Sequence, residues 1–191
     1  MMKKLFLAAA LAATTPFAAM AQDTTEGVAE SELEAARAVA NNSVFGGWIV
    51  NCEALTVRDT SCRLIQQLTL AESGALVARF IVLPVEDGAA VMLAQVPMGV
   101  FLPGGAVFRV EGADDDAQKE MIWQRCLGEL CEAAIRLEGE DIDALREADA
   151  MLFGYRIEVD GDPVVVRVDT SEFGAAIDAI REDAETEPAA E

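Results

Sequence analysis

Hydrophobic and polar residues alternate over short stretches through the middle of the chain, which is the period of half-buried β-strands. Turn residues separate many of these stretches, as in an all-β sandwich or barrel. Asp87-Gly88 and Asp160-Gly161-Asp162-Pro163 each lie between two stretches and predict hairpin turns. An Asp-Gly pair suits a turn in which both central positions have positive φ. We expect nine strands, over residues 45–51, 63–70, 76–86, 89–96, 107–111, 120–126, 132–137, 153–159 and 164–169.

Two segments have the helical period instead. Residues 141–150 place Ile142 and Leu145 on one face, and residues 171–180 do the same with Phe173, Ile177 and Ile180. The pattern therefore predicts a mainly β fold of about nine antiparallel strands with two short helices, one of them C-terminal. The apolar face of the second helix is expected to pack on the sheet.

The first 21 residues have the pattern of a secretory signal peptide. Lys3 and Lys4 precede an apolar run that ends at the small-x-small site Ala19-Met20-Ala21. We expect residues 22–42 to form an acidic leader, either flexible or with a short helix over 31–40. Residues 43–181 would then be the β-domain and residues 182–191 a disordered acidic tail. The predicted location is the periplasm, with or without outer-membrane association, and no later stretch is long enough to span a membrane as a helix.

Charge narrows the function classes. The chain has 34 acidic and 14 basic residues, no histidine and a net charge of −20. Without residues 1–21 it keeps 12 basic and 34 acidic residues, a net charge of −22, with Lys119 as its single lysine. Such a surface disfavours nucleic acids and anionic membranes, both of which select basic residues. The lack of histidine excludes Ser-His-Asp and Cys-His catalysis.

All four cysteines lie after the predicted cleavage site, at positions 52, 62, 126 and 131. In an oxidising compartment an even number of cysteines indicates disulfides, and three pairings are possible. We favour Cys52–Cys62 and Cys126–Cys131, because each pair joins the ends of adjacent predicted strands. The alternative is a four-thiolate zinc site, whose usual spacing the second pair fits and the first does not.

Acidic clusters are the candidate sites for other chemistry. Residues 114–116, the pair Asp141 and Asp143, and the pair Asp160 and Asp162 could in principle bind calcium, but none follows the EF-hand spacing. We expect them to lie in solvated loops, Lys119 to be exposed, and the protein to use no metal and no cofactor. A thiol–disulfide enzyme, a carboxylate-based hydrolase and a calcium-dependent adhesive module are the alternatives.

Residues 97–105 are unusually apolar for a connection between strands. Pro97-Met98-Gly99-Val100-Phe101-Leu102-Pro103-Gly104-Gly105 carries large hydrophobic side chains where loops normally carry polar turn residues. Such a segment is either buried or presents a contact surface. The candidate interaction surface is Met98, Val100, Phe101 and Leu102.

These features, taken in order along the chain, resemble the invasion-associated locus B family of exported bacterial proteins. The resemblance covers about residues 45–180 and departs from the family pattern at Ser61 and Leu130. It rests on the following residues: Phe45, Gly46, Trp48 and Cys52; Cys62 and Gln66; the apolar segment 96–105; Gln124-Arg125-Cys126 with Cys131; and Ser171, Phe173, Gly174 and Ala176.

The resemblance implies an immunoglobulin-like β-sandwich in the periplasm or at the outer membrane, and it brings no catalytic residues. We therefore expect a non-enzymatic interaction module of the cell envelope. Its partner would be an envelope or host protein, and its oligomeric state is open.

Overall fold

The computed structural model describes residues 39–57 and 60–186. The expected signal peptide, most of the acidic leader with its short helix, and residues 187–191 lie outside these ranges. Ten strands and two α-helices occur in the described part of the chain. The strands are β1 Val44–Phe45, β2 Trp48–Ala54, β3 Thr60–Thr69, β4 Leu76–Pro84, β5 Ala90–Pro97, β6 Ala106–Val110, β7 Lys119–Leu127, β8 Leu130–Leu137, β9 Ala150–Tyr155 and β10 Val164–Asp169; the helices are α2 Gly139–Glu147 and α3 Phe173–Thr186.

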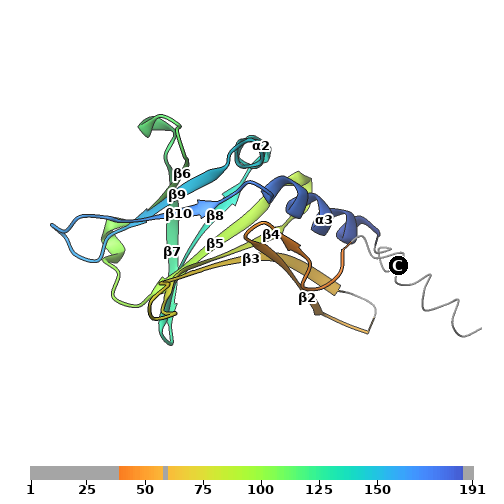
Figure 1. The fold of residues 1–191 in the computed structure, drawn as a ribbon, viewed down its shortest axis with the longest axis horizontal. Helices are drawn as coiled ribbons and strands as arrows, with labels where there is room; N and C mark the ends of the chain where they lie inside the picture. Colours follow the sequence, from red (N-terminus) through yellow and green to blue (C-terminus); the bar gives the residue numbers. More distant parts are fainter. Residues whose placement is uncertain (1–38, 58–59, 187–191) are drawn as a thin grey trace, which may run out of the picture. The chain divides into compact units, whose positions relative to one another are not determined.

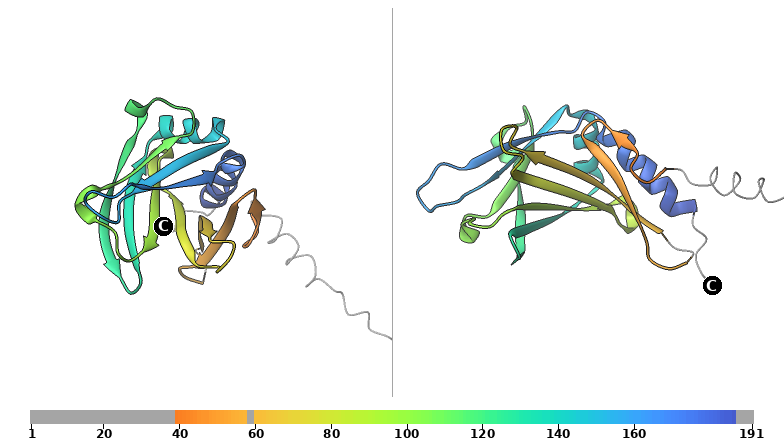
Figure 2. Two further views of the ribbon diagram at one scale, coloured as in Figure 1. Left: turned by 60° about the vertical axis from the view of Figure 1, so that its left-hand side comes forward. Right: turned by 60° about the horizontal axis from the view of Figure 1, so that its bottom comes forward.

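All strand pairs are antiparallel and form one curled sheet in the order β1-β2-β3-β4-β5-β8-β7-β6-β9-β10. The curl folds β6, β9 and β10 over the larger layer of β1–β5, β8 and β7, and the strands of the two layers cross (Figures 1 and 2). Phe80 of β4 and Phe153 of β9 meet edge to face with ring centroids 5.2 Å apart, which places the core between the layers.

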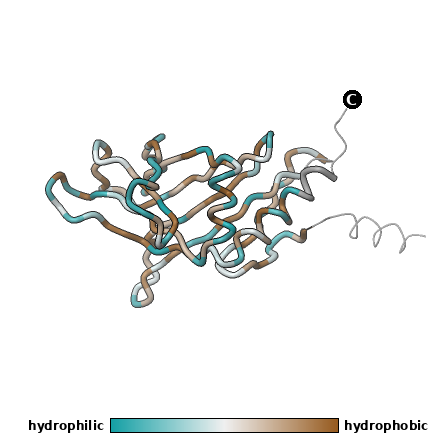
Figure 3. The backbone as a smooth tube through the Cα atoms, turned by 90° about the horizontal axis from the view of Figure 1, so that it is seen from above, coloured by the Kyte–Doolittle hydropathy of each residue, from teal (hydrophilic) through white to brown (hydrophobic). Residues whose placement is uncertain are grey.

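Alternate side chains of the strands point inward and form this core. On β5, for example, Ala90, Met92, Ala94 and Val96 are buried, while the residues between them face outward. Hydrophobic and hydrophilic residues alternate in the same way along much of the sheet (Figure 3).

Helix α3 covers the inner face of the sheet beside β1–β4 (Figure 1). Phe173, Ala176, Ile177 and Ile180 are all buried on one side of this helix. The Phe173 ring packs edge-on against Trp48 of β2, with centroids 5.4 Å apart. The predicted packing of the C-terminal helix on the sheet is therefore present.

The predicted mainly β fold with two helices is confirmed, and the ends of several elements differ. The segment 45–51 is two strands, because Gly46-Gly47 turns the chain between β1 and β2. Strand β9 ends at Tyr155, so Ile157 and Val159 lie in a loop. Helix α3 continues to Thr186, so residues 182–186, expected in the tail, belong to this helix.

The Asp87-Gly88 hairpin joins β4 and β5 as expected. Both residues have positive φ, 62° and 70°. The loop holds three residues, 86–88, because the amide of Val85 donates to the carbonyl of Ala89 (3.1 Å).

Candidate interaction surface

The apolar connection between β5 and β6 is anchored at its start and near its middle by backbone hydrogen bonds. The amide of Met98 donates to the carbonyl of Glu129 in the β7–β8 turn (2.9 Å), and the amide of Phe101 donates to the carbonyl of Arg156 after β9 (2.8 Å). The connection therefore runs from the β7–β8 turn, at the bottom of Figure 1, to the β9–β10 loop, at its left.

The four candidate residues divide into two exposed and two half-buried side chains. Met98 is 55% exposed and Leu102 is 46% exposed. Val100 packs against the core, and the Phe101 ring lies over Gly104, where an added Cβ would stand 3.0 Å from it. The segment is therefore partly buried and partly exposed, so neither of the two expected alternatives describes the whole of it.

The neighbouring loops add further exposed apolar side chains that the sequence analysis did not single out. Leu127 is 72% exposed in β7 next to the turn, and Ile157 and Val159 are 53% and 63% exposed in the β9–β10 loop. We call Met98, Leu102, Leu127, Ile157 and Val159 the loop-end surface. The apolar alternation that includes Ile157 and Val159 predicts a strand over residues 153–159, whereas the structure has both residues in a loop.

Two disulfides stabilise the described chain, and together they use all four cysteines. Cys52 is bonded to Cys62 and Cys126 to Cys131, which is the local pairing that the sequence favoured. Each pair joins directly opposed residues of neighbouring strands, β2 with β3 and β7 with β8. The Cys126–Cys131 bond holds the hairpin beside Leu127 and so supports the loop-end surface.

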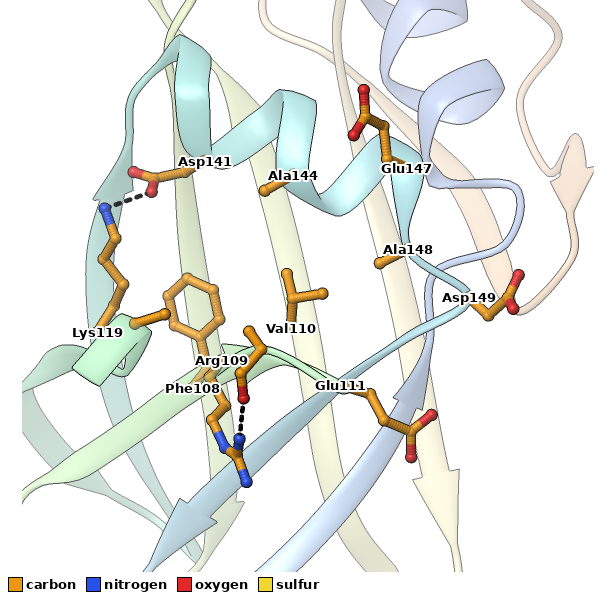
Figure 4. A pocket seen from close by; sticks show the side chains of 12 residues that line it. Phe108, Arg109, Val110, Glu111, Lys119, Asp141, Ala144, Glu147, Ala148 and Asp149 are labelled. Carbon is orange, nitrogen blue, oxygen red and sulfur yellow. Dashed lines mark hydrogen bonds and ion pairs between the residues drawn. The ribbon is translucent and has the colours of Figure 1, made fainter. Parts of the chain in front are cut away.

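A separate cavity of about 530 Å³ lies between β6, the acidic loop 111–118 and helix α2 (Figure 4). Phe108, Val110, Ala144 and Ala148 present apolar groups to it. Charged side chains lie around these groups. Sequence patterns did not reveal this cavity, because its walls come from β6–β7 and from a helix that follows β8.

The cations of this cavity are already paired. The Lys119 ammonium lies 2.5 Å from Asp141, and the Arg109 guanidinium donates to the carbonyl of Ala113 and lies 3.4 Å from Asp115. The hydrogen bond from Lys119 to Asp141 raises the pKa of the lysine, so it stays protonated. This ion pair attaches the first turn of α2 to β7.

Asp141 corrects an expectation from the sequence. Its side chain is 9% exposed rather than solvated in a loop. It occupies the first turn of α2, where it also accepts a hydrogen bond from the amide of Glu138 (3.1 Å) as half of a capping box. A buried carboxylate without a partner would destabilise the fold, and the ammonium of Lys119 and the amide of Glu138 are the partners of this one.

The described chain is thus an antiparallel β-protein with two local disulfides, and its curled, two-layered sheet is roughly consistent with the β-sandwich that the resemblance implied. The model of the invasion associated locus B (IalB) protein family matches residues 48–181, more than half of the chain, so the protein belongs to this family.

Curated relatives and a solved structure agree with this assignment. The invasion protein B homologs of Brucella abortus strain 2308 and of Brucella abortus biovar 1 strain 9-941 are each 25% identical over 137 residues, covering 72% of this chain and 77% of theirs. The crystal structure of invasion associated protein B from Bartonella henselae superposes with a TM-score of 0.68 at 18% identity, over 76% of this chain and 98% of that one. This structural likeness shows a shared fold. In the described residues, no helix has both the length and the apolar character needed to cross a membrane.

Proposed function

We propose that the protein is exported to the periplasm and acts there, or at the outer membrane, as a non-enzymatic binding protein of the cell envelope. The observation that carries this proposal is the loop-end surface, a set of five exposed apolar side chains. Backbone hydrogen bonds of Met98 and Phe101 anchor the β5–β6 connection, and the Cys126–Cys131 disulfide lies beside Leu127. Exposed apolar groups on ordered loops are characteristic of interaction sites. The signal-peptide pattern and the disulfides support export.

The proposed partner is a protein of the envelope or of a host cell. The relatives are named as invasion proteins, which supports a host-related role. The acidic surface would favour partners with basic residues around an apolar patch. The loop-end surface would then supply the apolar contact.

Cross-linking in intact cells tests this proposal. The variant Leu102→Asp places a charge on an exposed side chain and should reduce the yield of the cross-linked partner at least tenfold without unfolding the protein. Phe101→Asp should also abolish capture with the fold intact, because this ring supports the connection that carries Leu102. Val165→Asp, at an apolar position on β10 that is 58% exposed, is the matched control and should capture the partner normally.

Two results would contradict the proposal. If Leu102→Asp and Val165→Asp capture the same partner equally, the loop end is not the contact surface. If Leu102→Asp or Phe101→Asp unfolds, as measured by circular dichroism, the connection serves as core.

A further inference from the structure

The outward face of the larger sheet layer carries an apolar row that runs straight across six strands. The cross-strand register joins Ile49 to Ile65, Ile65 to Ile81, Ile81 to Leu93, Leu93 to Ala134, and Ala134 to Ile122. We call these six residues the outer apolar row. They belong, in order, to β2, β3, β4, β5, β8 and β7.

The side chains of this row point away from the core. Their chain neighbours Leu64, Val82 and Met92 are at most 1% exposed, and successive residues of a strand point to opposite faces. The row ends in Ile49 and Ile122, which are 44% and 67% exposed. Helix α3 and the smaller layer cover the inner face, so within the described residues nothing covers the row.

Polar residues border the row and bond mainly to one another. On one side, Arg79 donates to Gln67 (2.9 Å) and Gln95 donates to Glu132 (2.8 Å), with Arg125 3.5 Å from Glu132. An apolar centre with a polar border is the usual anatomy of a protein–protein interface. Oε1 of Gln95 is buried without a hydrogen-bond partner among the described residues, while the other polar groups named here are bonded or paired. The face therefore needs mainly an apolar surface opposite it.

The charge on this face differs from that of the whole chain. Four arginines border the row, and three of them lie within 3.5 Å of a carboxylate; Arg63 pairs with Glu53, Arg125 with Glu132 and Arg136 with Glu138. The face is therefore close to neutral, whereas the chain carries −20. Two acidic copies would meet with the least repulsion across such a face.

We infer that the outer apolar row is the contact between two copies of this chain in a symmetric dimer. A two-fold axis between β4 and β5 would place Ile81 of one copy against Leu93 of the other, and Ile49 against Ile122. Each residue of the row would then face a residue of the same row in the second copy. Six strands about 4.8 Å apart and three rows of side chains about 7 Å apart cover about 600 Å² per copy. The total, about 1,200 Å², is at the lower limit for a specific stable interface. The dimer would be two sheets packed face to face and would leave the loop-end surface free.

Sedimentation equilibrium on the full chain tests this inference between about 1 μM and about 1 mM protein. The average mass should rise toward that of two copies. Ile81→Lys should keep the protein monomeric, because a desolvated lysine would lie at the centre of the contact. Val165→Lys makes a comparable change on an exposed strand position of the smaller layer and should dimerise like the wild type.

Ile122→Lys keeps the inference testable if Ile81→Lys fails to fold, because Ile122 is the most exposed residue of the row. It should weaken dimerisation at least tenfold. A wild type that stays monomeric throughout the range overturns the inference, as does association that Ile81→Lys and Ile122→Lys leave unchanged. Binding of the monomer to phosphatidylglycerol vesicles, abolished by Ile122→Lys, would overturn it in favour of a lipid surface.

Discussion

The turn between β1 and β2 contains two neighbouring glycines, and at each of them a Cβ atom would be unfavourable. Gly46 has a φ of 56°, a conformation that side chains other than glycine adopt at a cost. Gly47 has no such φ, but a Cβ on it would overlap the side-chain amide of Gln66. Gln66 is 6% exposed on the inner face of β3, so it has little space to move away. The two neighbouring glycines are therefore required for different reasons, one for conformation and one for packing.

Gly47→Ala should accordingly destabilise the protein by about 1–3 kcal/mol, the usual cost of overpacking. Urea unfolding measures the change. Gly139→Ala is the matched control, because a Cβ at the first position of α2 meets nothing within 4 Å. Its effect should stay within about 0.5 kcal/mol. Equal stability of the two variants would show that Gln66 can move aside.

At the scale of elements, one ion pair joins the two helices. Nη1 of Arg146 on α2 donates to Oδ2 of Asp178 on α3 at 2.7 Å. This hydrogen bond and the charge of Arg146 hold the pKa of Asp178 below its usual range. The unfolded chain therefore binds a proton at a higher pH than the folded chain, and the stabilising effect is lost as the pH falls through the folded pKa.

The variant Asp178→Asn should be less stable than the wild type at pH 7 by less than about 1 kcal/mol, because the carboxylate is 52% exposed. The difference should shrink toward zero as the pH falls below about 3.9, the ordinary pKa of an aspartate, and through the lowered pKa of Asp178 in the folded protein. Thermal unfolding over a series of pH values from 7 downward measures it. Asp143→Asn removes a carboxylate 4.0 Å from Arg146 and should change less. A difference that does not depend on pH would exclude the ion pair as its cause.

Local patterns predicted most elements, and long-range contacts set the rest. The β4–β5 hairpin could be predicted from Asp87-Gly88, because these residue types adopt the positive φ that the turn needs, and both have it in the structure. Ala148 shows the limit of this approach. It was expected in the helix over 141–150, but its ψ of 147° is extended, and β9 begins at Ala150. Pairing of β9 with β6 and β10 selects this boundary, and no local pattern encodes it.

The strand order explains why the candidate site was only partly predictable. Sequence patterns identified the apolar segment with Met98 and Leu102. They did not show that the β7–β8 turn with Leu127 and the β9–β10 loop with Ile157 both bond to this segment, since that depends on β8 inserting between β5 and β7. The outer apolar row was hidden for the same reason. Its residues lie on six strands, and only the register aligns them.

At the scale of the whole molecule, the distribution of charge matters more than its sum. The acidic residues include the loop 114–116 and α2, while the outer apolar row has four arginines along its border. A chain of −20 repels its own copies at long range and can still associate through a near-neutral apolar face. Repulsion is screened by salt, whereas contact between apolar side chains is not weakened by it.

Salt should therefore strengthen the proposed dimer. The Debye length falls from about 30 Å at 0.01 M salt to about 8 Å at 0.15 M, so repulsion between the two acidic copies is largely screened at the higher concentration. We expect the dimer dissociation constant to fall on the order of tenfold over this range, as measured by sedimentation equilibrium. Ile81→Lys should stay monomeric at both salt concentrations. A dimer that weakens as salt rises would instead be held by charge pairs, and the apolar row could not be its main contact.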